Sequence, residues 1–263
     1  MRYTMVVGSP GGWGCAMLKA LFFDMDETLC DTSGANEQAT RMLGEALRRR
    51  YGSELDGEKI ARDYVSGIYR HWRDDQAARY LPIIERRGEG AFRVQLLCDL
   101  LDAAGADQAD AAAASELQRQ FDRDRLAAFD FYPGIPEFLA HARQFLTLVV
   151  ITNGPEFSQV PKIEAVNLST HVDHIIIGGQ EPEQKPARSI FDKALRLADC
   201  AAHEAIHVGD SLAADIAGAN DSRITSVWIQ HQQPLDAELG IEPQHTLMHP
   251  SEIPALIREL HPG

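Results

Sequence analysis

The hydrophobic residues of this 263-residue chain follow two patterns, each confined to its own regions. Short, continuous apolar runs predict strands that are covered on both faces, as in a parallel sheet. The first such run, residues 19–23, ends in acidic residues, and a second, 146–151, lies far along the chain. Further runs predict strands at 174–177, 205–208, 224–229 and 246–248.

Between residues 33 and 129 the apolar positions instead recur every three to four residues, which is typical of helices with one buried face. Breaks that contain Gly or Pro separate the repeats, so we expect a small all-helical bundle. The predicted helices of this insert are 35–51, 61–81, 90–104 and 107–128.

After residue 130, predicted helices alternate with the predicted strands. This alternation indicates an α/β fold: a Rossmann-like, doubly wound parallel sheet with an inserted all-α bundle. We expect residues 17–32 and 130–263 to form the core domain and residues 33–129 a separate helical domain. The helices expected in the core follow Pro133-Gly134, lie near 156–167, 187–199 and 212–220, and start again at Ser251.

The first sixteen residues lack this patterning. They contain one basic residue and a Gly/Pro break rather than the long apolar stretch of a signal peptide. We therefore expect residues 1–16 to be a disordered or wrongly assigned extension, with Met17 as the true start.

Composition removes several classes of function. The 39 acidic and 25 basic residues give a net charge of −14, which disfavours nucleic acid as a partner. No apolar run approaches the length of a bilayer span, so a membrane protein is not expected. The four cysteines show no CxxC spacing, which argues against a disulfide scaffold or a zinc site and fits a reducing cytoplasm. The sequence leaves a monomer and a homodimer equally open.

The negative charge is unevenly distributed. Residues 33–129 hold 15 basic and 17 acidic residues, a net of −2, and the rest holds 10 basic and 22 acidic, a net of −12. The excess of negative charge therefore lies outside the helical insert, mainly in the predicted core. An anionic substrate would meet the nearly neutral, arginine-rich helices of the insert.

Four short motifs follow predicted strands, where open parallel sheets bind ligands. Asp24 and Asp26 come directly after the first strand, so one carboxylate can act as a nucleophile and the other can transfer protons. Thr152 and Asn153 follow the second long run, where a hydroxyl and backbone amides can hold phosphoryl oxygens.

The other two motifs supply charge of both signs. Lys185, just before Pro186 and a predicted helix, offers a compact ammonium suited to a dianion and a carboxylate. Asp210 and Asp215 follow the strand at 205–208, and with the first two acids they could form an all-oxygen site for Mg²⁺.

The order of these motifs resembles that of the haloacid dehalogenase-like hydrolase superfamily, in its phosphatase branch. The resemblance runs from Met17 to the C-terminus, and the insert is similar to the α-helical, C1-type cap of that superfamily. The residues that carry it are Asp24-x-Asp26-x-Thr28, Thr152, Lys185, Gly209-Asp210 and Asp215.

The resemblance implies a role for each residue. Asp24 would form an aspartyl-phosphate, Asp26 would be the general acid/base with its backbone carbonyl on Mg²⁺, and Thr28 would fix the turn. Thr152 and the Asn153 backbone would bind the phosphoryl group. Lys185 would neutralise charge, Asp210 would ligate Mg²⁺, and Asp215 would support the metal.

The prediction is a cytoplasmic, Mg²⁺-dependent phosphomonoester hydrolase of a small phosphorylated metabolite, a nucleotide or sugar phosphate. A metal-independent 2-haloacid dehalogenase is disfavoured by Asp26, and phosphonate cleavage is disfavoured because Lys59 is the insert's sole lysine. A phosphosugar mutase would share every core residue, and a catalytically silent regulatory protein is a further alternative. We expect His207, inside a strand, to be a core or sheet-face residue.

Overall fold

The computed structural model describes residues 17–106, 110–231 and 239–261. The expectation for residues 1–16 concerns a segment outside these ranges. The chain divides into two compact units, Cys30–Asp130 and the remainder, Met1–Leu29 with Phe131–Gly263. The expected limits of the helical insert, 33 and 129, lie just inside the ends of the first of these units.

The α/β unit is built on one parallel sheet, which in the described residues has six strands in the order β3-β2-β1-β4-β5-β6. This is the doubly wound order, in which the chain leaves the central strand β1 in both directions. The predicted fold class is thus confirmed. The strands are β1 (Ala20–Phe23), β2 (Thr147–Thr152), β3 (His174–Ile177), β4 (Ala205–Gly209), β5 (Thr225–Ile229) and β6 (His245–Leu247).

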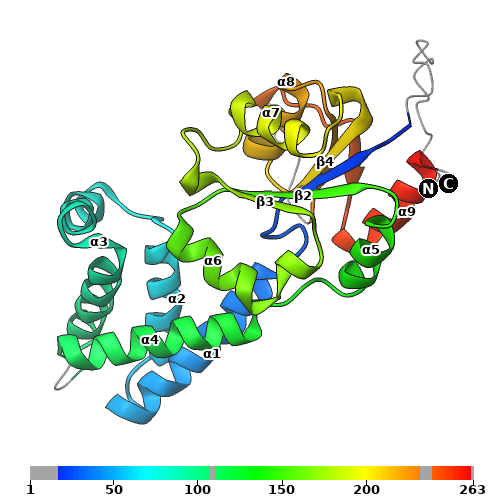
Figure 1. The fold of residues 1–263 in the computed structure, drawn as a ribbon. Coiled ribbons are helices and arrows are strands. Elements are labelled where there is room, and N and C mark those ends of the chain that lie inside the picture. Colours follow the sequence, from blue (N-terminus) through cyan, green and yellow to red (C-terminus); the bar gives the residue numbers. More distant parts are fainter. Residues whose placement is uncertain (1–16, 107–109, 232–238, 262–263) are drawn as a thin grey trace, which may run out of the picture. The chain divides into compact units, whose positions relative to one another are not determined.

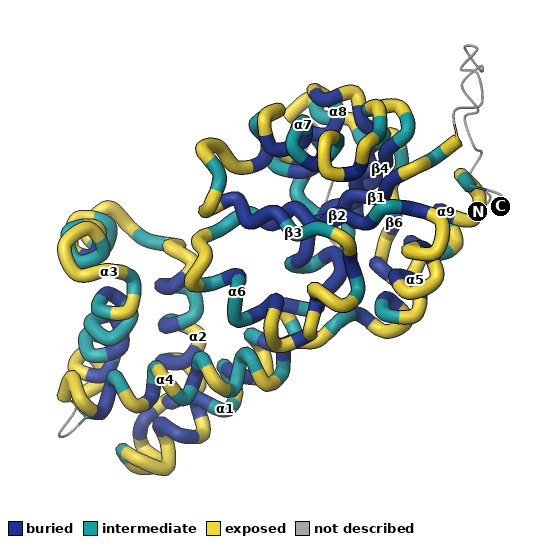
Figure 2. The backbone as a smooth tube through the Cα atoms, in the orientation of Figure 1, coloured by how far each residue is buried: buried dark blue, intermediate teal, exposed yellow. Residues whose placement is uncertain are grey.

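Helices cover both faces of this sheet. Figure 1 shows α7 (Arg188–Leu197) and α8 (Ala217–Asp221) on one face, and α5 (Ile135–Ala142) and α9 (Ile253–Leu260) on the other. Side chains of β1 alternate between the two: Phe22 packs with Phe191 of α7, and Phe23 meets Phe138 of α5 edge to face. The apolar runs are continuous because both faces are covered in this way, and β1 is fully buried (Figure 2).

Two of the helical connections between strands are not regular α-helices throughout. Helix α6 (Glu156–Ala165) follows β2 and contains Pro161. The helix expected at 212–220 is present in two parts, a π-helical turn at Leu212–Ile216 and α8. The side chain of Ser211 accepts from Ala214 N at 3.1 Å and so caps the start of the turn.

The helical unit comprises α1 (Thr32–Tyr51), α2 (Gly57–Ile68), α3 (Asp74–Ala103) and α4 (Ala111–Ala128) in the described residues. Asp31 begins α1 by accepting from Gly34 N at 2.7 Å. The four helices share a core to which each contributes large side chains, among them Leu43, Tyr64, Phe92 and Phe121.

The expected single helix at 61–81 is wrong. Helix α2 ends at Ile68, and Arg70 adopts a left-handed backbone with φ 60° before α3 begins at Asp74. The Trp72 indole donates to Gly67 O at 2.7 Å and stacks against Tyr80 and Phe92. The packing of Trp72 therefore fixes the turn, although its position in the sequence also fits the spacing of apolar residues in a helix.

The expected helix 90–104 is the second part of α3, which bends at Gly88. Gly88 has φ 82°, a conformation that glycine adopts without steric cost. Among the described residues, none of these helices is long and apolar enough to cross a membrane.

Candidate active site

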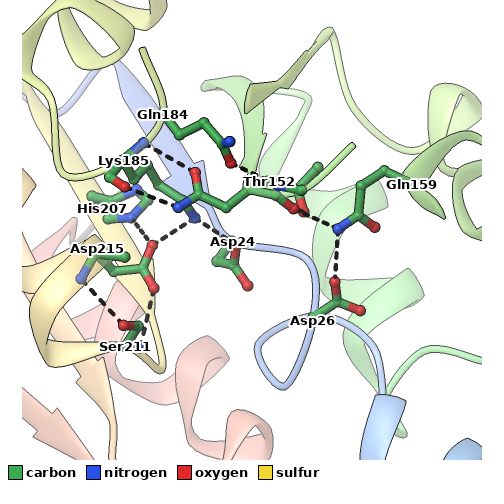
Figure 3. Close-up of polar contacts among 12 residues, drawn as sticks. Asp24, Asp26, Thr152, Gln159, Gln184, Lys185, His207, Ser211 and Asp215 are labelled. Atoms are coloured by element: carbon green, nitrogen blue, oxygen red, sulfur yellow. Dashed lines mark hydrogen bonds and ion pairs between the residues drawn. The ribbon is translucent and has the colours of Figure 1, made fainter. Parts of the chain in front are cut away.

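Parallel strands bring three of the four motifs to one edge of the sheet. Asp24 follows β1, Thr152 ends β2, and Asp210 follows β4, and both β2 and β4 flank β1. Asp24 N donates to Val208 O at 2.9 Å, so the pairing of β1 with β4 extends to the aspartate itself. The side chain of Asp24 therefore leaves the sheet at a fixed position beside β4 (Figure 3).

Lys185, which forms the remaining motif, lies against two of the predicted acids. Its Nζ is 2.5 Å from Asp24 Oδ1 and 2.7 Å from Asp215 Oδ1, and all three side chains are buried. Burial opposes the charge on the lysine, but Asp215 and Asp24 raise its pKa above the ordinary value. The ammonium is thus held as a cation between the two carboxylates.

Asp24 remains electrostatically strained despite this contact. Its pKa is raised to about 7, because burial and the charges of Asp215 and Asp26 together outweigh the lowering effect of Lys185. Asp210 shows the same effect, because burial first and then the charges of Asp24 and Asp215 raise its pKa to about 8. One lysine therefore leaves the acidic site with unbalanced negative charge.

These acids fit a divalent cation. Asp24, Asp210 and Asp215 each place a carboxylate oxygen within 4.8 Å of the others. Carboxylate oxygens are the ligands that Mg²⁺ prefers, and a dication would relieve the repulsion that raises the two pKa values. The Trp228 indole donates to Asp210 O at 2.8 Å and holds this strand end in place.

Asp215 has a further partner, His207, whose place inside a strand predicts only a core or sheet-face residue. His207 is completely buried in β4, and its Nε2 lies 2.9 Å from Asp215 Oδ1. Burial lowers the pKa of His207, so the neutral ring donates from Nε2 to the carboxylate. Burial alone would raise the pKa of Asp215, but Lys185 and His207 lower it to about 2.

The phosphate-binding residues predicted after β2 are tied to the lysine. Asn153 Nδ2 donates to Lys185 O at 2.9 Å, and Lys185 N donates back to Asn153 Oδ1 at 3.0 Å. Gly154 N donates to Gln184 Oε1 at 2.9 Å, which joins the same two loops. These hydrogen bonds join the loops after β2 and β3 into one wall, and Thr152 is buried beside them (Figure 3).

Asp26 behaves differently from Asp24. Its carboxylate lies outside the acidic group of Asp24, Asp210 and Asp215 and instead contacts α6 (Figure 3). Lys162 Nζ is 2.8 Å from Asp26 Oδ1, and Gln159 Nε2 is 3.2 Å from Asp26 Oδ2. The side chain of Asp26 is therefore no ligand in this arrangement, which leaves its backbone carbonyl for that predicted role.

Lys162 and Gln159 carry no recognisable signal in the sequence, because a lysine and a glutamine on a helix are usually solvated. Thr28, expected to fix the turn, is fully buried, and its hydroxyl has no hydrogen-bond partner in the described residues. The turn itself is fixed by Leu29 N, which donates to Met25 O at 3.0 Å.

The chain matches the model of a known protein family over most of its length. The family model of the haloacid dehalogenase-like hydrolases matches residues 18–222, which include all four motifs. The chain belongs to this family. The resemblance inferred from the motifs is thereby confirmed.

Curated members of the family align over most of the chain. N-acylneuraminate-9-phosphatase of Rattus norvegicus is 25% identical, over 94% of this chain and 96% of its own length. Glyceraldehyde 3-phosphate phosphatase of Pyrococcus abyssi is 29% identical, over 82% of each chain. These family members are phosphatases, and the chain is assigned with them to the phosphoric monoester hydrolases.

Solved structures agree on the fold. The HAD-hydrolase YfnB of Bacillus subtilis, crystallised with magnesium, superposes with a TM-score of 0.60 at 20% identity. The match covers 92% of this chain and 99% of that one. At this identity the likeness shows the shared fold alone.

Proposed function

We propose that this protein is a Mg²⁺-dependent phosphomonoester hydrolase that works through an aspartyl-phosphate on Asp24. The observation that carries the proposal is the convergence of Asp24, Asp210 and Asp215, with Lys185 Nζ bonded to two of them. A carboxylate attacks a phosphate dianion only when cations offset the repulsion. The site has one such cation built in and the ligands for a second.

In the first half of the reaction, an Oδ atom of Asp24 bonds to phosphorus as the ester P–O bond breaks. Asp26 gives its proton to the leaving oxygen, so that an alcohol departs rather than an alkoxide. Lys185 balances the charge on Asp24, while Thr152 and the backbone of Asn153 bind phosphoryl oxygens. Bound Mg²⁺, held by Asp24, Asp210, Asp215 and the carbonyl of Asp26, would supply further positive charge to those oxygens.

In the second half, water attacks phosphorus and Asp26 takes the proton of the water. The bond between phosphorus and Asp24 breaks, and inorganic phosphate leaves. Asp24 ends as a carboxylate and Asp26 ends protonated, as both began, so each turnover consumes one ester and one water.

The substrate in this proposal is a small phosphorylated metabolite, a sugar phosphate or nucleotide. Its support is the names of the relatives, which are phosphatases of N-acylneuraminate 9-phosphate and glyceraldehyde 3-phosphate. The helical unit, as a cap domain, would select the leaving group.

The test is a panel of phosphorylated metabolites with Mg²⁺, read by released phosphate, that includes the two substrates just named. Chelation with EDTA should stop the reaction, and added Mg²⁺ should restore it. Asp24→Asn is the matched negative control for a contaminating phosphatase.

Other outcomes would replace the proposal. Halide release from a 2-haloacid without Mg²⁺ would indicate a dehalogenase. Isomerisation of a phosphosugar without phosphate release would indicate a mutase. Mg²⁺ binding with no turnover across the panel would indicate a non-catalytic protein.

A further inference from the structure

A buried lysine in α6 has no role in the steps above. Lys162 is 6% exposed, and its Nζ lies 2.8 Å and 3.0 Å from the two carboxylate oxygens of Asp26. An ammonium removed from water is stable only when it is paired. The pair spans 136 residues of sequence, so the packing of α6 beside the turn after β1 creates it.

A second donor from α6 reaches the same carboxylate. Gln159, one helical turn before Lys162 and 5% exposed, donates from Nε2 to Asp26 Oδ2 at 3.2 Å. The same Nε2 lies 2.5 Å from Asn153 O. Gln159 therefore connects Asp26 to the loop that is proposed to bind the phosphoryl group (Figure 3).

The backbone leaves room for this bridge. Gly154 has φ 110°, and a Cβ at this position would lie 2.9 Å from Gln159 Nε2. Any larger residue would strain the backbone at this position, and its Cβ would also press against the side-chain amide of Gln159. The glycine allows the glutamine to approach the loop closely.

We propose that Lys162 and Gln159 are positioning residues that hold the Asp26 carboxyl group for proton transfer. This inference rests on the proposed function. A general acid must stay within hydrogen-bond reach of the leaving oxygen, and the Asp26 side chain is 25% exposed on a turn. Lys162 Nζ donates to both oxygens of Asp26 and Gln159 Nε2 donates to one of them, so the two side chains together fix the direction of the carboxyl group.

The experiment compares two esters of similar size, 4-nitrophenyl phosphate and 4-nitrobenzyl phosphate. Nitrophenolate leaves as a stable anion, whereas the benzylic alkoxide needs a proton. Lys162→Met should lower kcat/KM, which reports the steps up to transfer of the phosphoryl group to Asp24, by roughly 10²-fold for the benzyl ester, within the usual contribution of general acid catalysis, and far less for the phenyl ester. Lys162→Arg keeps a cation and should restore much of the wild-type ratio between the rates with the benzyl and the phenyl ester.

Lys193→Met is the matched control, because Lys193 is a partly exposed lysine of α7 that pairs with Glu181. It should leave both rates unchanged. In an Asp26→Asn background, Lys162→Met should have no further effect on either ester, since its effect passes through Asp26.

An equal loss of kcat/KM for both esters in Lys162→Met would overturn the inference and leave a structural role only. Faster cleavage of the benzyl ester, or a full effect in the Asp26→Asn background, would also overturn it. Failure of the wild-type protein to hydrolyse either ester or any metabolite of the panel would instead refute the proposed function, and this inference with it.

Discussion

Charged side chains behave differently in the two units of this molecule. In the helical unit many ion pairs join exposed groups one helical turn apart, such as Lys59 with Asp63, whose side chains are 64% and 44% exposed. In the α/β unit the side chains of Lys185 and Asp215 are 1% and 2% exposed and join segments far apart in the chain. Exposed pairs contribute little to stability, whereas a buried charge without its partner is costly.

This contrast explains why the charge balance alone is a weak guide to the site. The helical unit has many charges, most of which water can solvate. The α/β unit instead buries several charges together, and there the pKa values of Asp24 and Asp210 rise and the carboxylates favour a cation. Four substitutions test this difference, and they are given in order of decreasing effect.

The largest effect should come from Asp24→Asn. Losing the nucleophile should lower kcat by roughly 10³-fold or more, as for other nucleophile deletions. The matched control is Asp63→Asn, the same change on an exposed side chain of α2, which should leave kcat unaltered. Near-normal turnover in Asp24→Asn would remove the distinction between the two acids.

Lys185→Met should destabilise the fold as well as stop turnover. It leaves the buried Asp24 and Asp215 without their cation, and breaking a buried pair typically costs about 3–5 kcal/mol. The free energy of unfolding from urea titration, measured without metal, gives the stability loss. A loss below about 1 kcal/mol would show that the buried pair is no different from a surface pair.

A smaller effect is expected for His207→Met, which removes the donor to Asp215 and keeps an apolar side chain against Phe191. Partners of metal-site residues commonly contribute about 10–100-fold to metal affinity or activity. The Mg²⁺ concentration for half-maximal activity should rise by about this factor. His207→Gln keeps an N–H donor and should recover part of it; an equal loss in both variants would assign His207 to packing alone.

The smallest effect should come from Arg79→Met in the helical unit. Arg79 and Asp99 form a two-point ion pair, but the Arg79 side chain is 56% exposed. The free energy of unfolding should fall by no more than about 1 kcal/mol, with kcat unchanged. A loss of unfolding free energy as large as that of Lys185→Met would show that the exposure of an ion pair does not decide how much it stabilises either unit.

Much of the fold was predictable because its signals are local. All six strands lie close to their expected positions, and the clearest signals are the continuous apolar runs of β1 and β2, which are covered on both faces. The break after α2 was missed, because Trp72 continues a helical spacing and only its packing against Phe92 shows that it belongs to a turn.

The amino-acid sequence was sufficient to predict which segments become strands, their succession along the chain and the polar residues at the end of each. That was enough to bring Asp24, Thr152 and Asp210 to one edge, because parallel neighbouring strands end on the same side. The tertiary structure alone decided which of these acids share Lys185, and that Asp26 pairs with Lys162 and Asp215 with His207. Such pairs depend on distances of a few ångströms between segments far apart in the chain, which side-chain packing sets and local patterns do not encode.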